Sequence, residues 1–404
     1  NKTGALEAGI ASIVKRFKGK EKMLIPVLMI LFALGGSTYG MAEETLAFYA
    51  LIIPVMIAVG FDTVVAVAIV LVGSQVGCLA STVNPFATGV ASQAVGISMG
   101  QGMGLRFFML VVLTGISILY VYRYASKIEK DPTKSLVYKN READIQHFDI
   151  ASIEKQENIT QRQKWVNVVF FGSFVIMIMS LVPWDMLNEH FTFFNDFTTW
   201  LTSIPGLGVV LGKSMVPFGA WYFPEITMLF IVMAVVVAFV YRMKESEFIS
   251  AFLEGASDMI GVAIVVAVAR GIQVVMNNGM ITDTILHWGE QGLQGLSSSL
   301  FIILTFIFYL PMSFLIPSTS GLAAATMGIM GPMGEFANVS KDLVITAYQS
   351  ASGILNLITP TSAVVMGALA IARFNIGTWW KFMAKLIVIQ LVVIMVILGV
   401  AAVL

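Results

Sequence analysis

Charge is scarce in this chain of 404 residues. Asp, Glu, Lys and Arg make up only 12% of the sequence, whereas roughly 25% is usual in a soluble domain. Hydrophobic residues make up 57%, and the formal net charge is zero. The low charge argues against an ordinary soluble domain, and the neutral balance argues against nucleic acid as a partner. We therefore predict a polytopic membrane protein, since several apolar runs reach the length of about 20 residues that spans a bilayer.

Cysteine is almost absent as well. Cys78 is the single cysteine, which excludes an internal disulfide and any metal cluster made of cysteines. The three histidines lie far apart in the sequence, and no spacing of a nucleophile and a base or of zinc ligands is present. We therefore predict that the protein is not an enzyme and needs no cofactor, apart from a sodium ion considered below. The chain begins with Asn1 and has no signal peptide, so we expect upstream native sequence to be missing.

A ten-residue pattern is present twice within this apolar sequence. Residues 37–46 read STYGMAEETL and residues 318–327 read STSGLAAATM, with five identical positions. Glycine and small polar residues at membrane depth interrupt helices, and the freed backbone groups must be satisfied by protein or by a polar cavity. A matched pair of interrupted segments, one in each half, indicates the binding site of a transporter.

Lys and Arg clusters orient the chain, because basic residues are enriched in cytoplasmic loops. With the basic segment before residue 23 in the cytoplasm, the two patterns enter the membrane from opposite sides. We predict an all-α polytopic membrane protein with an inverted repeat, in which each half has a re-entrant helical hairpin and a proline-broken transmembrane helix. The arms of the first hairpin are expected to meet at residues 35–38, and those of the second at residues 317–321. Residues 245–257 are expected to form a surface helix, followed by a spanning helix over 259–278.

The predicted segments are as follows, in chain order: a cytoplasmic N-terminal segment (1–22); a first repeat (23–125) with hairpin 23–60, broken helix 63–98 and helix 104–124; a cytoplasmic linker (126–164); scaffold helices and external loops (165–298); and a second repeat (299–404) with hairpin 299–337, broken helix 341–372 and helix 380–402.

Each half contains a second break, marked by Pro85 in one half and Pro360 in the other. Aligned on these prolines, Ser81 corresponds to Asn356 and Asn84 to Thr359. Proline removes a helical hydrogen bond and frees carbonyl groups, and oxygen atoms are the ligands that hard cations prefer. The alternative is packing, since glycines spaced as in Gly73-x-x-x-Gly77 allow two helices to approach closely. Four breaks in matched pairs favour a polar cavity.

Charged groups near the breaks are candidates for substrate recognition. Glu43 and Glu44 follow the expected tip of the first hairpin, where the second repeat has alanines. They either stabilise a helix start or provide negative charge for a cationic substrate group or a proton. Arg270 lies in an apolar run with Asn278 two turns further on, and it either reaches an interface or binds a substrate carboxylate.

At these residues the chain resembles the ion transporter superfamily, and within it the YfcC-like group, which is related to anaerobic four-carbon dicarboxylate carriers and basic amino-acid antiporters. The resemblance rests on residues 35–48 (GGSTYGMAEETLAF), 74–86 (SQVGCLASTVNPF), 318–327 and 358–369 (ITPTSAVVMGAL). It implies that hairpin tips and helix breaks hold substrate carboxylate and sodium. Thr38 and Thr319 stand where Asn is common in the signature of the superfamily.

We expect a secondary active transporter of a small charged metabolite, working by alternating access in the bacterial inner membrane as a homodimer surrounded by lipid. A basic amino acid such as arginine or ornithine is the first candidate substrate, and the alternatives are a sodium- or proton-coupled four-carbon dicarboxylate carrier or an ion channel. The expected substrate-binding residues are Ser37, Thr38, Glu43, Glu44, Ser81, Asn84, Arg270, Asn278, Ser318, Thr319, Ser320, Asn356, Thr359 and Thr361. The expected sodium ligands are Ser37, Ser81, Asn84, Ser318, Asn356 and Thr359.

Overall fold

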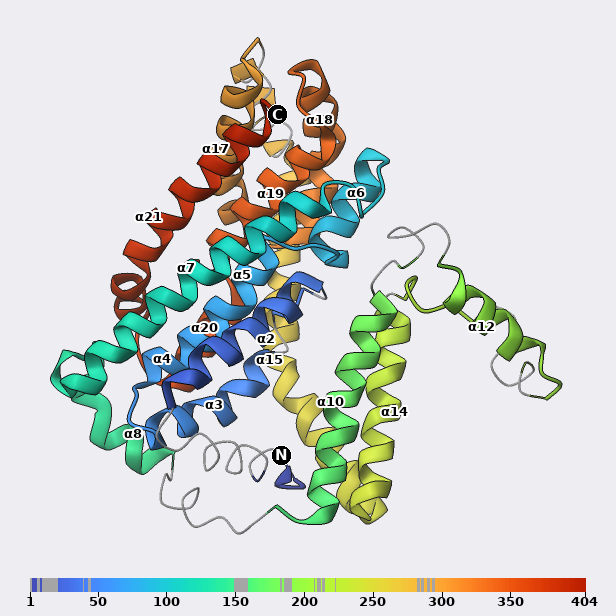
Figure 1. The fold of residues 1–404 in the computed structure, drawn as a ribbon, viewed down its shortest axis with the longest axis vertical. Helices are drawn as coiled ribbons and strands as arrows, with labels where there is room; N and C mark the ends of the chain where they lie inside the picture. The colour runs from blue at the N-terminus through green and yellow to red at the C-terminus, as the bar shows by residue number, and fades with distance from the viewer. Residues whose placement is uncertain are drawn as a thin grey trace.

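The computed structural model of the protein describes residues 2–5, 8, 21–38, 40–42, 45–148, 159–181, 184, 191–206, 208, 212, 215–221, 223–281, 284, 287–288, 291–292 and 295–404. In this part of the chain every regular element is a helix, which confirms the all-α prediction. Figure 1 shows a bundle of tilted helices, with one helical pair beside it and one helix, α12, standing away from it.

Residues 24–130 and residues 298–401 each form a similar series of helices (Figure 1). The first series is α2 (Leu24–Thr38), α3 (Leu46–Ala58), α4 (Thr63–Val67), η3 (Ala68–Val72), α5 (Gly73–Leu79), η4 (Pro85–Gly89), α6 (Val90–Val95) and α7 (Met103–Lys130). The second series is α17 (Ser298–Leu315), α18 (Thr319–Phe336), α19 (Lys341–Leu355), α20 (Ala363–Ala372) and α21 (Ile376–Ala401). The interruptions at residues 80–84 and 356–362 lie where proline and small polar residues predict them.

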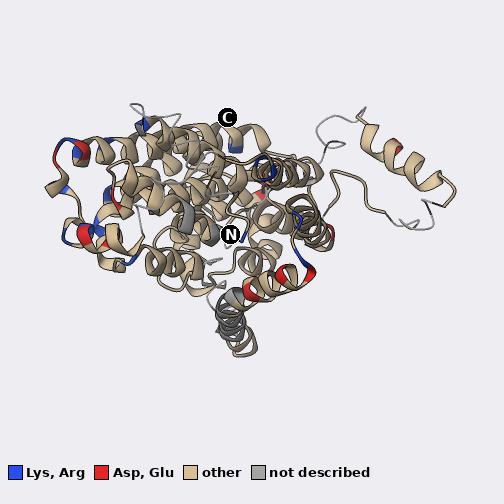
Figure 2. Cartoon of the chain, turned by 90° about the horizontal axis from the view of Figure 1, so that it is seen from below, with Lys and Arg blue, Asp and Glu red and all other residues tan. Residues whose placement is uncertain are grey.

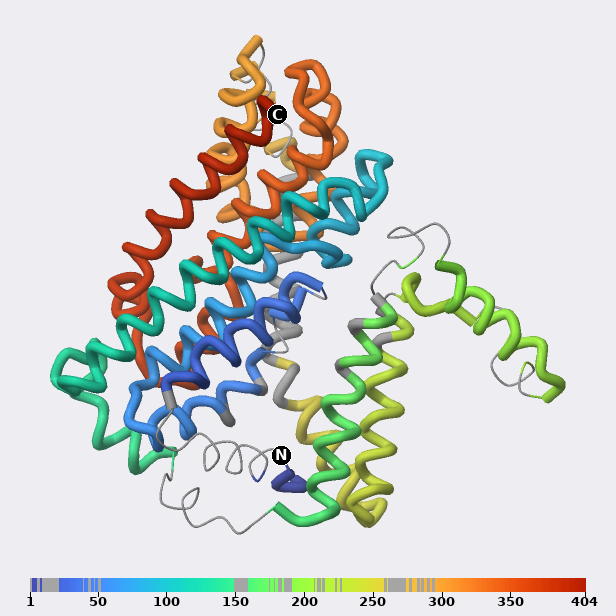
Figure 3. Tube along the Cα trace, in the orientation of Figure 1, coloured from blue at the N-terminus to red at the C-terminus, as the bar shows by residue number. Residues whose placement is uncertain are grey.

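Helix packing in one series corresponds to helix packing in the other. α2 packs along α5 and α7, and α17 packs along α19 and α21. The second arms cross over between the series, since α3 contacts α20 and α18 contacts α6. α5 and α19 contact each other, so the two interrupted helices meet in the interior of the bundle (Figure 3). The breaks of both halves are thereby brought together.

Two helix–break–helix segments, α2–α3 and α17–α18, lie at opposite ends of the bundle. The α3–α4 junction contacts the linker, because Ser135 donates a hydrogen bond to the Asp62 carboxylate. At the other end, Ser298 donates to the carbonyl of Ala337 and Ser299 to that of Gly399. Gly399 lies near the end of α21, a helix of 26 residues and therefore about 39 Å long. The α3–α4 junction thus lies at the linker end of the bundle, and the start of α17 and the end of α18 lie at the other end.

The arms of the first predicted hairpin do not meet at residues 35–38, where we expected them to meet. α2 continues through Gly35 and Gly36 to Thr38, and the interruption falls between α2 and α3. A Cβ atom on Gly36 would lie 2.0 Å from the carbonyl oxygen of Ser74, and one on Gly77 would lie 2.1 Å from that of Ala33. These glycines therefore serve close packing of α2 on α5, as the pattern of Gly73 and Gly77 allowed.

Three helices are long and apolar enough to cross a membrane among the described residues: Met103–Lys130, Ser298–Leu315 and Ile376–Ala401. The second of these is the first arm of the predicted second hairpin. At 18 residues, α17 is about 27 Å long, close to the thickness of the hydrocarbon core. This arm is therefore as long as a spanning helix of minimal length.

The middle of the chain forms α10 (Gln161–Leu181), α12 (Phe193–Ser203), α14 (Phe223–Tyr241) and α15 (Glu245–Asn278). α10 and α14 pack as a pair beside the bundle (Figure 1). The prediction of a surface helix over 245–257 followed by a separate spanning helix is wrong, because α15 is one continuous helix of 34 residues. No proline interrupts this stretch, so the change from polar to apolar sequence does not end the helix.

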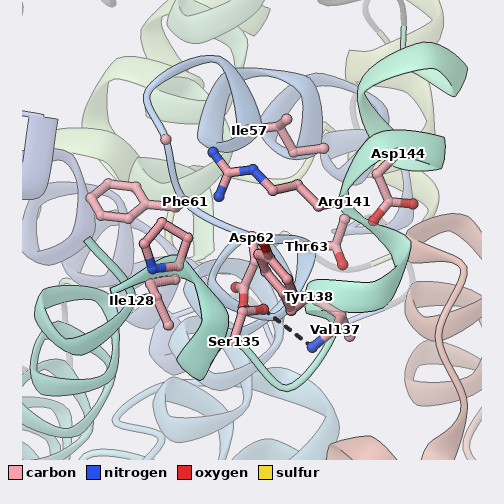
Figure 4. Close-up of a pocket in the computed structure, with 12 residues that line it drawn as sticks. Ile57, Phe61, Asp62, Thr63, Ile128, Ser135, Val137, Tyr138, Arg141 and Asp144 are labelled. Atoms are coloured by element: carbon pink, nitrogen blue, oxygen red, sulfur yellow. Dashed lines mark hydrogen bonds between the residues drawn. The ribbon is translucent and has the colours of Figure 1, made fainter. Parts of the chain in front are cut away.

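The linker folds onto the bundle through the part-buried carboxylate of Asp62. This carboxylate accepts hydrogen bonds from Tyr124, Ser135 and the backbone of Val65, and Figure 4 shows it among the linker residues that line a small pocket. Burial raises the pKa of Asp62, and the three hydrogen bonds partly oppose that rise. Asp144 of α8 (Arg141–His147) lines the same pocket. Burial also raises the pKa of Asp144, against the charge of Arg373.

Charged residues gather at the linker end of the bundle, at the left of Figure 2. Lys22, which precedes α2, pairs with Glu129 near the end of α7. Arg373, at the end of α20, lines a surface pocket together with Lys139 of the linker. Lys22, Lys139 and Arg373, which the sequence assigns to the cytoplasm, therefore lie at one end of the bundle.

Candidate functional site

From here on, the first break is the interruption at residues 80–84 and the second break is that at residues 356–362. The last turn of α2, called the first tip, packs against the first break. Ser37 Oγ lies 3.1 Å from Thr82 Oγ1 and accepts a hydrogen bond from the Thr82 backbone N–H at 3.0 Å. The carbonyl of Ser37 also accepts from the N–H groups of Thr82 and Val83. Since both residues are buried, these contacts satisfy backbone groups that the interruption frees.

A glutamine joins the two halves at the centre of the bundle. Gln349 Oε1 accepts hydrogen bonds from Ser81 Oγ at 3.2 Å and from Thr88 Oγ1 at 2.9 Å. Its Nε2 donates to the carbonyl of Ser81 at 3.1 Å. Ser350 adds a bond to the carbonyl of Leu79 at 3.1 Å. These side chains are at most 2% exposed, so the centre is a polar network inside an apolar bundle.

The tip of the second helix pair contacts the second interrupted helix. Thr319 Oγ1 lies 3.2 Å from Ser352 Oγ and accepts from Asn356 Nδ2 at 3.4 Å. The carbonyl of Thr319 accepts from the hydroxyl of Tyr348. Ser318 caps α18 by accepting from the N–H of Gly321. This tip therefore uses Thr319, and its neighbour Ser318 has a local role at the helix start.

Carbonyl groups of the second break are satisfied by two indole groups. Trp379 Nε1 donates to the carbonyl of Leu357 at 2.8 Å, and Trp380 Nε1 donates to that of Ile358 at 2.9 Å. Trp379 is fully buried, while Trp380 is 47% exposed. The helix that carries both, α21, thus fixes the break of its own half.

Arg106 of α7 has the same position in the first half. Its Nη2 donates to the carbonyl of Thr82 at 3.4 Å and to that of Met99 at 2.6 Å. The side chain is 0% exposed, yet Nε and Nη1 have no hydrogen-bond partner. We did not single out this residue from the sequence. A signal was present, because Arg106 is the single charged residue between Asp62 and Arg123.

The other expected binding residues are spread over the bundle. Asn84 lies against Gly40 and caps the helix after the first break through the N–H groups of Phe86 and Ala87. The hydroxyl of Thr38 donates to the carbonyl of Leu34 in its own helix. Thr359 Oγ1 lies 2.9 Å from Thr361 Oγ1.

The remaining expected residues are not brought to the breaks by any described contact. Ser320 lies half-buried in the first turn of α18, and Asn278 is exposed at the end of α15. Glu43 and Glu44 lie outside the described residues, as does the side chain of Arg270, whose backbone is in α15.

The sodium site expected on six residues stays a prediction. Their hydrogen bonds divide them among the first tip, the central network and the second break. The side-chain oxygens of Ser37, Asn84 and Ser318 already accept backbone N–H groups. Among the described residues, no group of three or more His, Cys, Asp or Glu could hold a metal ion.

Comparison with known sequences identifies the family. A sequence profile of the DcuC family, described as "C4-dicarboxylate anaerobic carrier", matches residues 1–403. The chain belongs to the DcuC family. A protein of Haemophilus influenzae with the name "Uncharacterized protein" is 31% identical over 96% of this chain and 69% of its own length. A protein of Escherichia coli K12 named "Putative basic amino acid antiporter YfcC" is 30% identical over 96% of this chain and 71% of its own length.

Solved structures of transporters share the fold of this DcuC-family chain. MtrF of Neisseria gonorrhoeae, described among antimetabolite efflux pumps, aligns over 99% of this chain and 78% of its own with a TM-score of 0.54 at 20% identity. The YdaH transporter of Alcanivorax borkumensis, described as having an unusual topology, aligns over 98% and 81% with a TM-score of 0.55 at 16% identity. The prediction of a membrane transporter of the YfcC-like type is thereby confirmed.

Proposed function

We propose that this transporter moves small charged metabolites that carry a carboxylate group, by alternating access around the two helix breaks. The observation that carries the proposal is the central network, in which Gln349 of one half binds Ser81 and Thr88 of the other. Polar groups deep in an apolar bundle, contributed equally by two interrupted helices, suit a substrate site at the membrane midplane.

We further propose that the two halves are inverted repeats with re-entrant hairpins. Three correspondences support this. The helix contacts match pair by pair, and the helix–break–helix segments lie at opposite ends of the bundle. Aligned on Pro85 and Pro360, Thr82 corresponds to Leu357, and the carbonyls of these two residues are bound by side chains of the fourth residue of α7 and of α21.

The first candidate substrate is a basic amino acid. The name of the Escherichia coli relative points in this direction, and so does the acidic pair Glu43 and Glu44 beside the first tip. The second candidate is a four-carbon dicarboxylate, which the description of the family favours. Both molecules carry carboxylate, so the shared requirement is an anion-binding group and the difference lies in the second charged end.

The experiment is uptake into proteoliposomes containing the purified full chain. Labelled L-arginine and labelled succinate are offered separately, with and without a sodium gradient and a proton gradient. Saturable uptake and counterflow of arginine support the first candidate, and those of succinate support the second. Unitary currents without counterflow would instead indicate an ion channel. A requirement for sodium would support the predicted coupling ion, and indifference to sodium would contradict it.

We also propose a multi-pass location in the bacterial inner membrane, with the linker end of the bundle in the cytoplasm, and a homodimeric assembly. The basic linker end supports the orientation. Mass measurement of the detergent-solubilised protein tests the assembly, since a single-chain mass would contradict it. Protease accessibility of the linker in inside-out vesicles, but not in right-side-out vesicles, tests the orientation.

A further inference from the structure

We propose that Arg106 binds a carboxylate group of the transported molecule beside the first break. This inference rests on the proposed transport of carboxylate-bearing metabolites and adds the residue that recognises the carboxylate. Its basis is a buried guanidinium whose hydrogen bonds are only partly used.

The guanidinium has more donors than the protein satisfies. Arginine presents five N–H groups in a fixed planar fork, and Arg106 uses Nη2 for the carbonyls of Thr82 and Met99. Nε and Nη1 have no partner, although the side chain is 0% exposed. Unpaired donors of a buried cation are costly, and an arginine in a membrane-spanning helix marks a functional group more often than a structural one. The free donors therefore indicate an anionic partner that binds there.

The second half shows that the structural task requires no charge. Trp379 stands at the equivalent position of α21 and binds the carbonyl of Leu357 with its single N–H group. It is fully buried, and its donor is satisfied. A neutral indole thus fixes one break, while a cation with two unpartnered nitrogens stands at the other. The charge at Arg106 is left for another purpose.

The protein itself does not neutralise this charge by direct pairing. Asp342, in the first turn of α19, lies against Gly102, one helical turn before Arg106. Among the described residues, however, no ion pair involves Arg106. Asp342 therefore lies near Arg106 without forming an ion pair with it.

Arg106 is also directly connected to the residues that a moving substrate would meet. Thr82, whose carbonyl Arg106 binds, also holds Ser37 of the first tip, because its hydroxyl and its backbone N–H both contact the Ser37 hydroxyl. A carboxylate bound to Nε or Nη1 would thus be coupled to the position of the tip. Carboxylate suits these nitrogens because it accepts charge-assisted N–H bonds from a guanidinium, whereas an ammonium group would be repelled. The amino end or the second acid group of the substrate must lie elsewhere.

The test compares carboxylates with their amides on the purified full chain. Thermal unfolding is measured with L-arginine against L-argininamide and with succinate against succinamide, since selective binding raises apparent stability. We expect at least one carboxylate to stabilise the wild type more than its amide does. We expect Arg106→Gln to abolish this preference, and Arg106→Lys to weaken binding about tenfold, because it keeps the charge and loses the Nε and Nη1 donors. Arg123→Gln, an exposed arginine on the same helix, is the matched control and should keep the preference.

The outcomes that overturn the inference are separate from failure of transport. Equal stabilisation of the wild type by carboxylates and amides would overturn it, even if uptake is observed. An Arg106→Lys variant with wild-type KM for uptake would do the same. If Arg106→Gln fails to fold, the lysine variant and the amide comparison decide. Absence of uptake of both probes, with the carboxylate preference intact, would count against the proposed function alone.

Discussion

The two interrupted helices of this transporter are fixed by equivalent contacts of different chemistry. In the first half, the cationic Arg106 binds the break carbonyl and leaves two nitrogens free. In the second half, the neutral Trp379 binds the equivalent carbonyl with its single donor. An architecture shared between the halves thus holds both breaks in place, while the charge belongs to one half alone. The difference separates the residues that maintain the fold from those available for recognition.

The packing beneath the breaks differs in the same way. α2 approaches α5 through glycines, with Gly36 against the backbone of Ser74 and Gly77 against that of Ala33. α17 packs on α19 with larger side chains, and the ring centroids of Tyr309 and Tyr348 lie 5.4 Å apart. Backbone against backbone leaves little freedom for a side chain to adjust. We therefore expect the first half to tolerate substitution less well than the second.

The largest expected effect comes from adding one methyl group at the glycine contact. A Cβ atom on Gly77 would overlap the carbonyl of Ala33, so Gly77→Ala should destabilise the protein by about 3 kcal/mol or more and reduce the folded yield. Ser352→Ala, at the corresponding position of the second half, should cost only about 1 kcal/mol through its lost bond to Thr319. Thermal unfolding in detergent measures both. Gly115→Ala, with open space around it, is the control, and equal losses at Gly77 and Ser352 would contradict the comparison.

An intermediate effect is expected at the second break. Trp379→Phe replaces the indole by a smaller aromatic ring and removes the donor to the carbonyl of Leu357, so stability should fall by about 1–3 kcal/mol or more while the KM for uptake stays near the wild-type value. Arg106→Lys should show the reverse, with a raised KM and a smaller loss of stability. Unfolding and uptake measured on the same preparations check the pair. A Trp379→Phe variant with an altered KM and unchanged stability would show that the two breaks do not divide these tasks.

The smallest expected effect concerns the starts of the interrupted helices. Asp62 caps the first through the N–H of Val65, whereas Ser340 begins the second without a side-chain cap bond. Burial raises the pKa of Asp62, so the protonated carboxyl stabilises linker docking at low pH, and this contribution is lost as pH rises through the folded-state pKa. Hydrogen exchange of residues 131–148 should therefore become faster, relative to its intrinsic rate, over this pH range.

Matched variants assign that pH dependence. Asp62→Asn keeps an oxygen for the N–H of Val65 and removes the charge, so most of the slope should disappear. Asp144→Asn should remove a smaller part, since burial raises that pKa too and the charge of Arg373 opposes the rise. An unchanged slope in Asp62→Asn would show that the carboxyl does not control docking. Residues near Ser340 should show no such slope, which provides the comparison within the same molecule.

Much of this architecture follows from the sequence, because proline and clusters of small polar residues mark real interruptions. The breaks at residues 80–84 and 356–362 and the start of α18 at Thr319 lie where Pro85, Pro360 and Pro317 predict them. The prediction failed at Gly35 and Gly36, since glycine indicates a break and a close contact equally well. Which of the two occurs depends on whether another helix packs against the glycines. Here α5 does so, and its position cannot be read from the local sequence.

The site could be predicted only in part, for a geometrical reason. Ser37, Ser81 and Thr319 join contacts between tips and breaks, and small polar residues at breaks predicted them. Alignment on the prolines places Arg106 opposite Lys381, because the segment from Pro85 to the start of α7 is two residues longer than that from Pro360 to the start of α21. Only the structure shows that Trp379 is the equivalent residue. Its indole and the guanidinium of Arg106 share no sequence pattern, and what they share is a carbonyl to bind.

The indoles at the second break give this transporter an optical property. Of its seven tryptophans, Trp379 and Trp380 donate directly to carbonyls of an interrupted helix. Indole emission changes in wavelength and yield when its hydrogen bond or the polarity around it changes. Any movement that separates α21 from the carbonyls of Leu357 and Ile358 therefore alters the intrinsic fluorescence. Trp379 and Trp380 thus report on the second break without an added label.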